Sequence, residues 1–146
     1  TTHQELNSRF SISNPNIWIS GLNPHAGENG TIGDEEQKFI IPIIKKLQSE
    51  GYNLLGPLSA DTMFYGKKRP RFDAAICMYH DQALIPIKTL DFHTSVNLTI
   101  GLSFIRTSPD HGTAFDIAGR NLANPTSTIE AIKLAWNMAK KEQKDR

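Results

Sequence analysis

Short apolar runs alternate with amphipathic segments along this chain of 146 residues, and that order is typical of α/β domains. Residues 17–19 and 74–79 are continuous apolar runs, which predict buried strands. Residues 95–100 alternate in polarity and predict another strand, with 53–58 and 104–106 as shorter candidates. We therefore expect an α/β fold in which ligands collect outside the carboxyl ends of the strands.

Two segments carry the apolar spacing of helices. The first includes Pro42, which should bend the helix or mark a second start, because proline removes a backbone donor. The second should begin at Ser127 or Thr128. Residues three and four apart form the apolar stripes, namely Phe39, Ile40, Ile43, Ile44 and Leu47 in the first helix and Ile129, Ile132, Leu134, Ala135 and Met138 in the second.

Composition narrows the class of protein. The chain is 38% hydrophobic and 21% charged, which excludes an intrinsically disordered protein. No apolar run approaches the roughly 20 residues of a membrane helix. A net charge of +1 gives no electrostatic reason to expect nucleic acid or an anionic membrane as a partner. The single cysteine, Cys77, excludes an internal disulfide, and no secretion signal opens the chain, so we expect a cytoplasmic protein with one core.

Ionisable residues follow the predicted strands. His25 comes after the first strand, in a glycine-rich loop, and His80 comes after the strand at 74–79. Asp61 and Asp81 stand at element boundaries. Imidazole and carboxylate ligands suit Zn²⁺, Mn²⁺ or Co²⁺, although the spacings match no compact metal motif. The alternative is structural: surface or capping histidines, Asp61 capping a helix with Ser59, and Asp81 in a turn after the strand.

Phosphate-binding signals are few. The chain contains neither G-x-G-x-x-G nor a P-loop. His111, Gly112 and Thr113 precede a short predicted helix at 114–119, which is either an anion site at a helix N-terminus or a plain helix start. Lys88 and Arg106 are cations near strands, usable for phosphate or simply surface charges. We interpret the basic loop at 65–72 as a solvated face.

Four stretches together resemble the 4-hydroxythreonine-4-phosphate dehydrogenase family of pyridoxal phosphate biosynthesis: GLNPHAGENGTIGDEE, LSADTMF, MYHDQALIPIK and VNLTIGLSFIRTSPDHGTAFDIAGR. The resemblance covers nearly the whole chain from Gln4 onward. HGTAFDIAGRNLANP is also similar to the nucleotide-binding segment of isopropylmalate and isocitrate dehydrogenases. The resemblance implies an isocitrate/isopropylmalate dehydrogenase-like sandwich, with residues 1–146 as the C-terminal part of a two-domain enzyme.

The same resemblance implies roles for individual residues. Matching positions in the family bind a divalent metal (Zn, Mg or Co), which assigns His25 and His80 as ligands, with Asp61 beside the ion. Asp61 or Asp81 would orient ligands or move a proton, and Lys88 would supply positive charge to the reacting substrate. The substrate contacts would be Lys88, Asn97 and Arg106, and the adenosine part of NAD would face His111, Gly112, Thr113 and Asp116, with Asp116 on the ribose hydroxyls.

The activity that the resemblance implies is the NAD-dependent, metal-assisted oxidative decarboxylation of 4-phosphooxy-L-threonine to 3-amino-2-oxopropyl phosphate. The family works as a homodimer with active sites at the subunit interface, so we expect an apolar interface on this chain. One alternative is a sister dehydrogenase acting on erythronate or threonate 4-phosphate. The other is a catalytically inert fragment that binds metal or phosphate.

The family's chains are longer than this one, and Thr1-Thr2-His3 opens it without methionine. We therefore expect a C-terminal portion that lacks the N-terminal half, with further residues missing between His3 and Gln4. The family's third metal-binding histidine is expected outside this chain. On that interpretation the fragment alone would be inactive.

Overall fold

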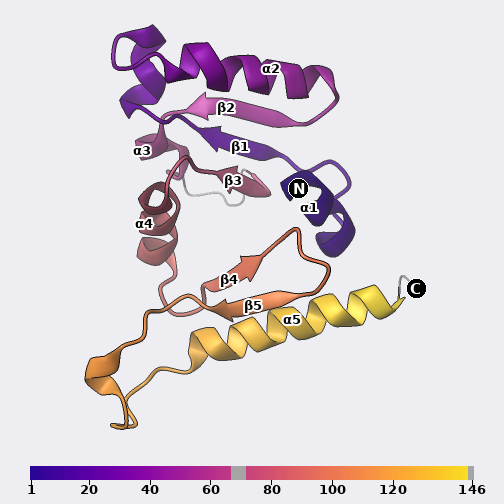
Figure 1. The fold of residues 1–146 in the computed structure, drawn as a ribbon, viewed down its shortest axis with the longest axis vertical. Helices are drawn as coiled ribbons and strands as arrows, with labels where there is room; N and C mark the ends of the chain where they lie inside the picture. The colour runs from indigo at the N-terminus through magenta and orange to yellow at the C-terminus, as the bar shows by residue number, and fades with distance from the viewer. Residues whose placement is uncertain (67–71, 145–146) are drawn as a thin grey trace.

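The computed structural model describes residues 1–66 and 72–144, which form two layers joined by one helix (Figure 1). Most of the predicted basic loop, residues 67–71, lies outside the described residues. The first layer is a three-stranded sheet with a helix along it, and the second is a hairpin with a long helix beneath it. The described residues contain no helix that is long and apolar enough to cross a membrane.

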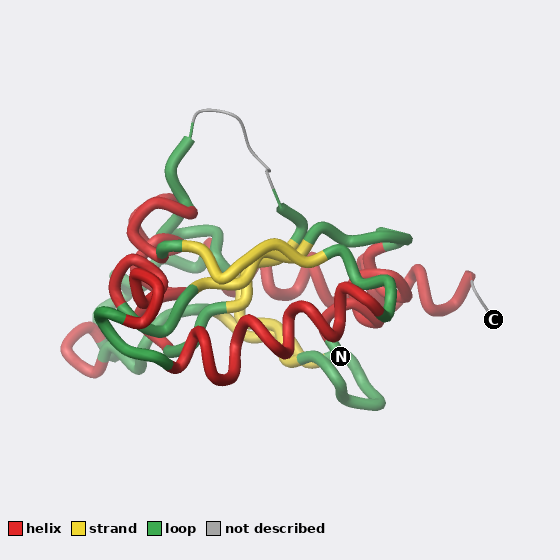
Figure 2. The backbone as a smooth tube through the Cα atoms, turned by 90° about the horizontal axis from the view of Figure 1, so that it is seen from above, coloured by secondary structure: helices red, strands yellow, loops and turns green. Residues whose placement is uncertain are grey.

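The first layer confirms the predicted α/β class. Its strands are β1 (Ile17–Ser20), β2 (Leu54–Leu58) and β3 (Ala74–Ile76), all parallel, in the order β2-β1-β3. Helix α2 (Ile41–Ser49) runs alongside these strands, as the view from above shows (Figure 2). The apolar side chains that bury each other here are Ile17, Ile19, Ile44 and Leu54. Because all three strands are parallel, their carboxyl ends meet at one edge of the sheet.

Pro42 marks a second helix start, one of the two outcomes that we expected. A π-helical turn, Glu36–Ile40, comes first, and α2 then begins with Pro42 in its first turn, where the missing amide donor costs nothing. The expected apolar stripe is only partly buried, because Phe39 and Ile43 face solvent while Ile44 packs on the sheet.

The joining helix, α4 (His80–Leu90), was not predicted from the sequence. The strand predicted at 74–79 ends at Ile76, and α4 starts after residues 77–79. Asp81 lies in the first helical turn, so the alternative that placed it in a turn after the strand is wrong. Two other short helices are α1 (Thr2–Phe10) and α3 (Ala60–Met63). Helix α1 runs through His3 and Gln4, and missing residues at this point remain a prediction.

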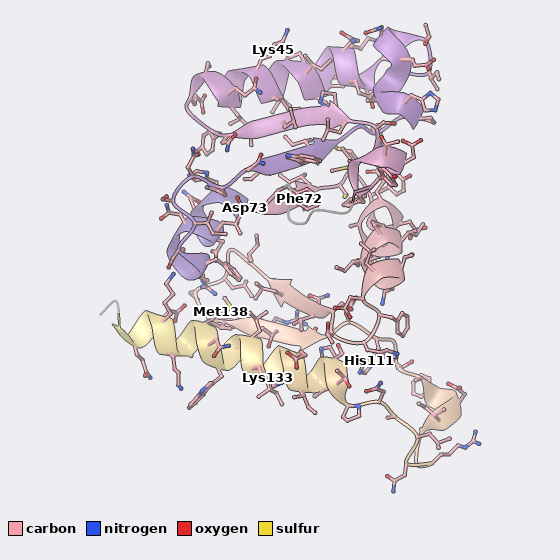
Figure 3. All side chains as sticks on the ribbon, turned by 180° about the vertical axis from the view of Figure 1, so that it is seen from behind. Lys45, Phe72, Asp73, His111, Lys133 and Met138 are labelled. Atoms are coloured by element: carbon pink, nitrogen blue, oxygen red, sulfur yellow. The ribbon has the colours of Figure 1, made fainter. Side chains whose placement is uncertain are left out.

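The second layer is an antiparallel hairpin, β4 (Val96–Thr99) and β5 (Arg106–Pro109), on helix α5 (Thr126–Lys144). The strand expected at 104–106 therefore begins only at Arg106 and continues through polar residues. The stripe expected on α5 is wrong in part: Ile129 and Ile132 are exposed, whereas Ala131 and Met138 are buried. Figure 3 shows Met138 and Lys133 on opposite sides of α5.

The accessible surface is larger than the length predicts. It amounts to 10138 Å², whereas a compact monomer of this mass exposes about 7,500 Å². Large apolar side chains contribute to the excess throughout the chain, and those in the second layer or just before it are Phe92, Phe104, Phe115, Leu122, Ile129, Ile132 and Trp136. The expectation of one self-contained core is therefore wrong, because neither layer covers the other.

Candidate functional site

The three parallel strands bring the sequence-predicted metal ligands to one edge of the sheet. His25 follows β1, Asp61 follows β2 and His80 follows β3. The segment that carries His25 packs on β2 and on α3, the helix that carries Asp61. The charge of Asp61 contributes to a raised pKa of His25, in keeping with this packing.

His25 is presented by a left-handed turn. Residues 25–29 all have positive φ, between 41° and 81°, within the segment Pro24–Gly30. His25, Ala26 and Glu28 each cost about 1–2 kcal/mol in this conformation, which glycine and asparagine tolerate better. Thr31 closes the turn, because its amide and its hydroxyl both donate to the Glu28 carbonyl. Such a run of strained residues marks the loop as a candidate functional element.

Glu28 orients the ring of His25. His25 Nδ1 donates to Glu28 Oε1 at 2.9 Å, so Nε2 is the ring nitrogen that remains for a metal or a proton. This hydrogen bond and the charge of Glu28 raise the pKa of His25, and Asp61 raises it further. The Ser59 hydroxyl donates to Asp61 Oδ1 at 2.7 Å. That bond, with the nearby His25, lowers the pKa of Asp61.

A buried carboxylate supports the same loop from below. Glu36 is 1% exposed, and its Oε1 accepts hydrogen bonds from the amides of Leu22 (2.7 Å) and Asn23 (2.8 Å). Its Oε2 accepts a third from Asn23 Nδ2 at 2.9 Å. Burial raises the pKa of Glu36, but these hydrogen bonds outweigh it and hold the pKa below its usual range.

Gln82 ties the end of β1 to helix α4. Its Nε2 donates to the Gly21 carbonyl at 2.8 Å, and its Oε1 accepts from the Ser20 hydroxyl and from the Met78 amide. Gln82 and Ser20 are both buried, so these bonds are shielded from water. The two segments that bear His25 and His80 are thereby held in one register.

One face of α4 carries three of the predicted site residues. His80, Asp81 and Lys88 line an open pocket of about 430 Å³ together with Leu84, Ile85 and Thr89. Their spacing of one, three and four residues places them on adjacent rows of one helix face. The helix that the sequence analysis missed is therefore the element that brings these side chains together.

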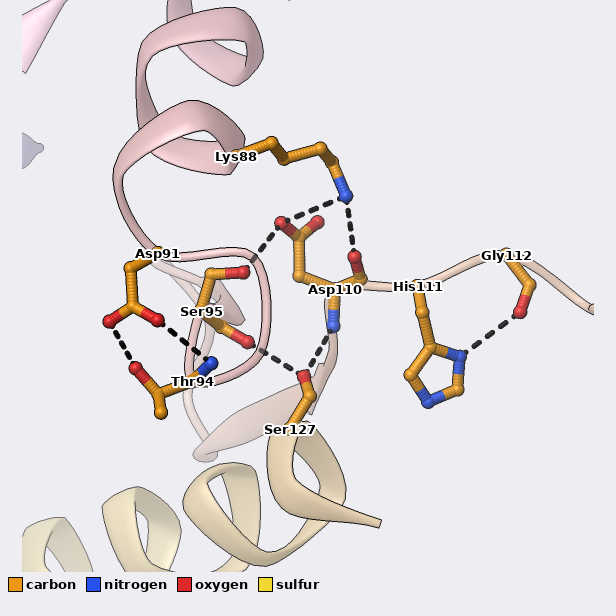
Figure 4. Close-up of polar contacts among 8 residues, drawn as sticks. All are labelled: Lys88, Asp91, Thr94, Ser95, Asp110, His111, Gly112 and Ser127. Atoms are coloured by element: carbon orange, nitrogen blue, oxygen red, sulfur yellow. Dashed lines mark hydrogen bonds and ion pairs between the residues drawn. The ribbon is translucent and has the colours of Figure 1, made fainter. Parts of the chain in front are cut away.

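Lys88 is anchored by Asp110, which the sequence analysis did not single out. Lys88 Nζ donates to the Asp110 carbonyl at 2.7 Å and pairs with Asp110 Oδ2 at 3.3 Å (Figure 4). Ser95 also donates to that carboxylate, and Ser127 links the Asp110 amide to the Ser95 carbonyl. This network joins α4, the hairpin and the start of α5, because Ser127 in α5 hydrogen-bonds to the residues on either side of the hairpin, Ser95 and Asp110 (Figure 4).

Asn97 and Arg106 share one face of the hairpin. Thr99 pairs with Arg106 across the strands, and Asn97 lies two residues from Thr99, so all three side chains point the same way. The opposite face packs on α5, where the Thr107 hydroxyl donates to the Ala131 carbonyl. Arg106 donates to Thr99 Oγ1 at 2.8 Å and remains exposed.

The predicted nucleotide-binding segment forms its own pocket of about 290 Å³. His111, Gly112 and Thr113 line it, with Ala114 and residues from 117 to 123. The predicted short helix is reduced to one 3₁₀ turn, Phe115–Ile117, capped by Ala114, so the anion site expected at a helix N-terminus is not supported. Asp116 lies in that turn, outside the pocket lining. Figure 3 shows His111 at the start of this segment.

The donor chemistry of the sheet edge fits a divalent metal in part. His25 has the carboxylate-bound Nδ1 that is typical of histidine ligands, and Asp61 adds an oxygen donor nearby. Within residues 1–66 and 72–144, no three His, Cys, Asp or Glu side chains converge closely enough to hold an ion. The chain thus supplies single ligands of the right kind, and the complete ligand set remains a prediction.

Comparison with known families now identifies the chain. The family described as "Pyridoxal phosphate biosynthetic protein PdxA" matches residues 1–135. The chain belongs to the PdxA family. Its 4-hydroxythreonine-4-phosphate dehydrogenase relative from Roseobacter denitrificans is 64% identical over 138 residues, which cover 94% of this chain and 42% of the relative. The chain thus spans about two fifths of the length of the curated relatives that it matches.

Solved structures of PdxA-like proteins agree with this assignment. The 4-hydroxythreonine-4-phosphate dehydrogenase from Klebsiella pneumoniae is 39% identical and superposes with a TM-score of 0.78, over 92% of this chain and 41% of that one. A terephthalate 1,2-cis-dihydrodioldehydrogenase from Burkholderia xenovorans is 36% identical, with a TM-score of 0.70, over 93% and 43%. Proteins with different named substrates therefore share this architecture.

The residues missed from sequence share one property. Glu28, Glu36, Gln82 and Asp110 are polar side chains that hold a predicted site residue or its loop in place. All four stand within the motifs quoted above, but the motifs do not show which groups these side chains contact.

Proposed function

We propose that this chain is part of an NAD-dependent dehydrogenase that converts 4-phosphooxy-L-threonine to 3-amino-2-oxopropyl phosphate in pyridoxal phosphate biosynthesis. The observation that carries the proposal is the family match over residues 1–135, in a chain whose strand ends carry His25, Asp61 and His80. In this reaction the carbinol carbon loses a hydride, and carbon dioxide then leaves from the resulting 3-oxo acid.

The metal would be held by His25, His80 and Asp61, with Zn²⁺, Mg²⁺ or Co²⁺ as candidates. When bound, such an ion supplies Lewis-acid polarisation of the substrate hydroxyl. Glu28 keeps His25 Nδ1 protonated and leaves Nε2 as the ring nitrogen available to a ligand. Asp61, whose pKa is lowered by Ser59, stays ionised and is suited to orient the substrate or accept a proton. Asp81 is the second candidate for that proton, since it lies beside His80 in the α4 pocket.

Substrate binding would fall to Lys88, Asn97 and Arg106. Lys88 retains donors besides those engaged by Asp110, because an ammonium has three N–H groups. Arg106 presents a planar guanidinium, which matches a phosphate or carboxylate in two-point contact. Asn97 stands on the same hairpin face as Arg106 and offers an amide to the same ligand.

NAD, when bound, supplies the hydride acceptor. Its adenosine part would lie against His111, Gly112 and Thr113, where small residues allow close approach to the backbone. Asp116 would bond the ribose hydroxyls, and this requires its turn to move toward the pocket. The pocket of about 290 Å³ suits one part of the dinucleotide better than the whole.

We also propose the assembly that the family resemblance implies: an isocitrate dehydrogenase-like, two-domain subunit in a cytoplasmic homodimer, with the active site between subunits. The open arrangement of two layers and the exposed Ile132 and Trp136 on α5 support this. Within the described part of one chain, the candidate metal ligands do not converge closely enough to hold an ion. A site shared between subunits is consistent with this. The 146-residue chain by itself is then expected to be inactive.

A second candidate substrate is erythronate or threonate 4-phosphate. The chain is structurally similar to the Burkholderia xenovorans enzyme, which is named for a dihydrodiol. Since structural relatives differ in named substrate, we retain this second candidate substrate. The test is NADH production by the protein expressed from its complete reading frame, with each substrate in turn. Faster turnover of 4-phosphooxy-L-threonine supports the proposal. Turnover of only the sugar-acid phosphates, or of neither, overturns it.

A further inference from the structure

The strained turn that carries His25 needs a restraint, because L-residues do not favour its conformation. His25, Ala26, Glu28 and Asn29 are all left-handed, with φ between 41° and 57°. Only Gly27 adopts this conformation without a steric cost. An isolated peptide of this sequence would leave the left-handed region, so neighbouring groups must over-determine the turn.

Glu36 is the group best placed to do so. Its carboxylate receives three hydrogen bonds of 2.7–2.9 Å from Leu22 and Asn23, the residues that lead into the turn. Asn23 in turn accepts at its carbonyl from the Ala26 amide, inside the turn. The π-helical turn at Glu36–Ile40 lets this side chain lie beneath the loop.

Close packing also links Glu36 to the turn. A Cβ placed on Gly27 would lie 2.7 Å from Glu36 Oε2, and one on Gly21 would lie 3.2 Å from Oε1. Both glycines are therefore in contact with the carboxylate on either side of the Leu22–Asn23 segment. The loop and the carboxylate fit each other with no spare room.

Burying a carboxylate is costly unless its acceptor sites are filled. Among the described residues, no Lys, Arg or His pairs with Glu36, so backbone and amide donors alone compensate for its burial. An ionised carboxylate accepts all three N–H groups, whereas a neutral amide would direct two hydrogens at one of those donors.

We propose that Glu36 is a positioning residue, which locks residues 25–29 in the left-handed conformation and thereby fixes the direction of the His25 ring. The conformational part stands on the turn alone. The consequence for metal binding rests on the proposed function of His25.

The first test measures conformation in the isotopically labelled chain of 146 residues. One-bond Cα–Hα couplings distinguish positive from negative φ, and we compare wild type with Glu36→Gln and with Asp34→Asn. Within residues 1–66 and 72–144, Asp34 forms an ion pair with Lys38 alone, and this pair is exposed, so Asp34 is a matched charge control. We expect Glu36→Gln alone to lose the positive-φ couplings at Ala26 and Glu28, with amide exchange at Leu22 and Asn23 at least tenfold faster. Identical couplings and exchange in all three proteins would overturn the proposal.

The second test measures the Zn²⁺ affinity of the same three proteins and of His25→Asn by competition with a chromophoric chelator. Loss of a supporting group outside the ligand shell weakens metal binding by roughly 10–100-fold, which we expect for Glu36→Gln but not for Asp34→Asn. Unchanged affinity in His25→Asn would refute the metal role of His25, while the couplings would still decide the role of Glu36. Weakened binding in His25→Asn with unchanged binding in Glu36→Gln would refute positioning.

Should Glu36→Gln fail to fold, Asn23→Ala removes the side-chain hydrogen bonds of Asn23 to Glu36 and to Glu35, and keeps the two backbone amide bonds to Glu36. We then expect an intermediate effect, with partial loss of the positive-φ couplings and a Zn²⁺ affinity between those of wild type and His25→Asn. Couplings and affinity equal to wild type in Asn23→Ala would count against the proposal.

Discussion

The interior of each of the two layers is stabilised by a different kind of interaction. The parallel sheet with α2 has a continuous apolar core around Ile17 and Ile44, and its polar groups gather at one edge. The hairpin with α5 buries few apolar side chains and depends on the Lys88–Asp110 network to join its elements. The comparison teaches that the first layer is a scaffold for the candidate site, whereas the second is a partly covered element that lacks a full core of its own.

The largest effect should come from the core of the first layer. Replacing Ile44, which is 3% exposed, by Ala removes three buried carbons and should lower the free energy of unfolding by about 3 kcal/mol. Ile43 precedes it on the same helix and is 57% exposed, so Ile43→Ala should change that free energy by less than about 0.5 kcal/mol. Urea denaturation measures both. Equal losses would mean that α2 packs on the sheet through another face.

The corresponding pair of substitutions in the second layer should show a smaller difference in the free energy of unfolding. Met138 is 4% exposed against the hairpin and Ile132 is 64% exposed on the far side of α5. We expect Met138→Ala to cost about 2 kcal/mol, because a thin layer can collapse around the cavity, and Ile132→Ala to cost less than about 0.5 kcal/mol. Urea denaturation followed by α5 helicity tests this. A loss in Met138→Ala that exceeds the loss in Ile44→Ala would reverse the comparison.

Removing the Asp110 carboxylate should loosen the second layer selectively. Asp110→Ala leaves Lys88 and Ser95 without a side-chain acceptor, which should cost about 1–2 kcal/mol. Hydrogen exchange should report this as faster exchange of the β4–β5 amides and unchanged exchange in β1. The control is Glu130→Ala, which breaks the exposed pair with Lys133 and should cost less than about 0.5 kcal/mol. Faster exchange in β1 than in the hairpin would contradict the assignment.

Acid should act on the first layer through Glu36. Its folded pKa lies below the ordinary 4.5, so its contribution to stability is complete above that value and is lost as pH falls through the folded pKa. The slope cannot exceed about 1.4 kcal/mol per pH unit, the value for one proton. Denaturation between neutral and acid pH should show a shallower acid slope in Glu36→Gln than in wild type. Parallel slopes would show that Glu36 titrates alike in both states.

Sequence reasoning performed best where apolar periodicity is strong. Strand β1 and helix α2 could be predicted because each carries a regular pattern of apolar residues. In the structure these apolar residues pack on each other. Helix α4 was missed because it contains Pro86 and buries only Gln82, so its sequence has no apolar stripe that predicts a helix. Strand β5 was displaced because Arg106–Pro109 is polar and is defined by its ladder with β4.

The candidate site divides in the same way. The sequence placed His25 and His80 after predicted strands, where ligands collect in open α/β sheets. Asp61 was predicted only at an element boundary, and it joins that edge because β2 lies parallel beside β1. Two of the supporting residues could not be found because their partners are distant in sequence: Gln82 and Gly21 are 61 residues apart, and Lys88 and Asp110 are 22 apart. Glu28 is only three residues from His25, but the left-handed turn that brings them together has no apolar pattern to predict it. Burial of a polar side chain depends on the folded neighbours that satisfy it.

Gln82 has a consequence for cooperativity. A primary amide presents an acceptor and a donor on adjacent atoms, and here the oxygen serves Ser20 and Met78 while the nitrogen serves Gly21. Glutamate lacks the donor, and asparagine is one methylene shorter. Opening α4 would therefore break the bond that ends β1, and the two histidine-bearing segments should exchange their amides as one unit.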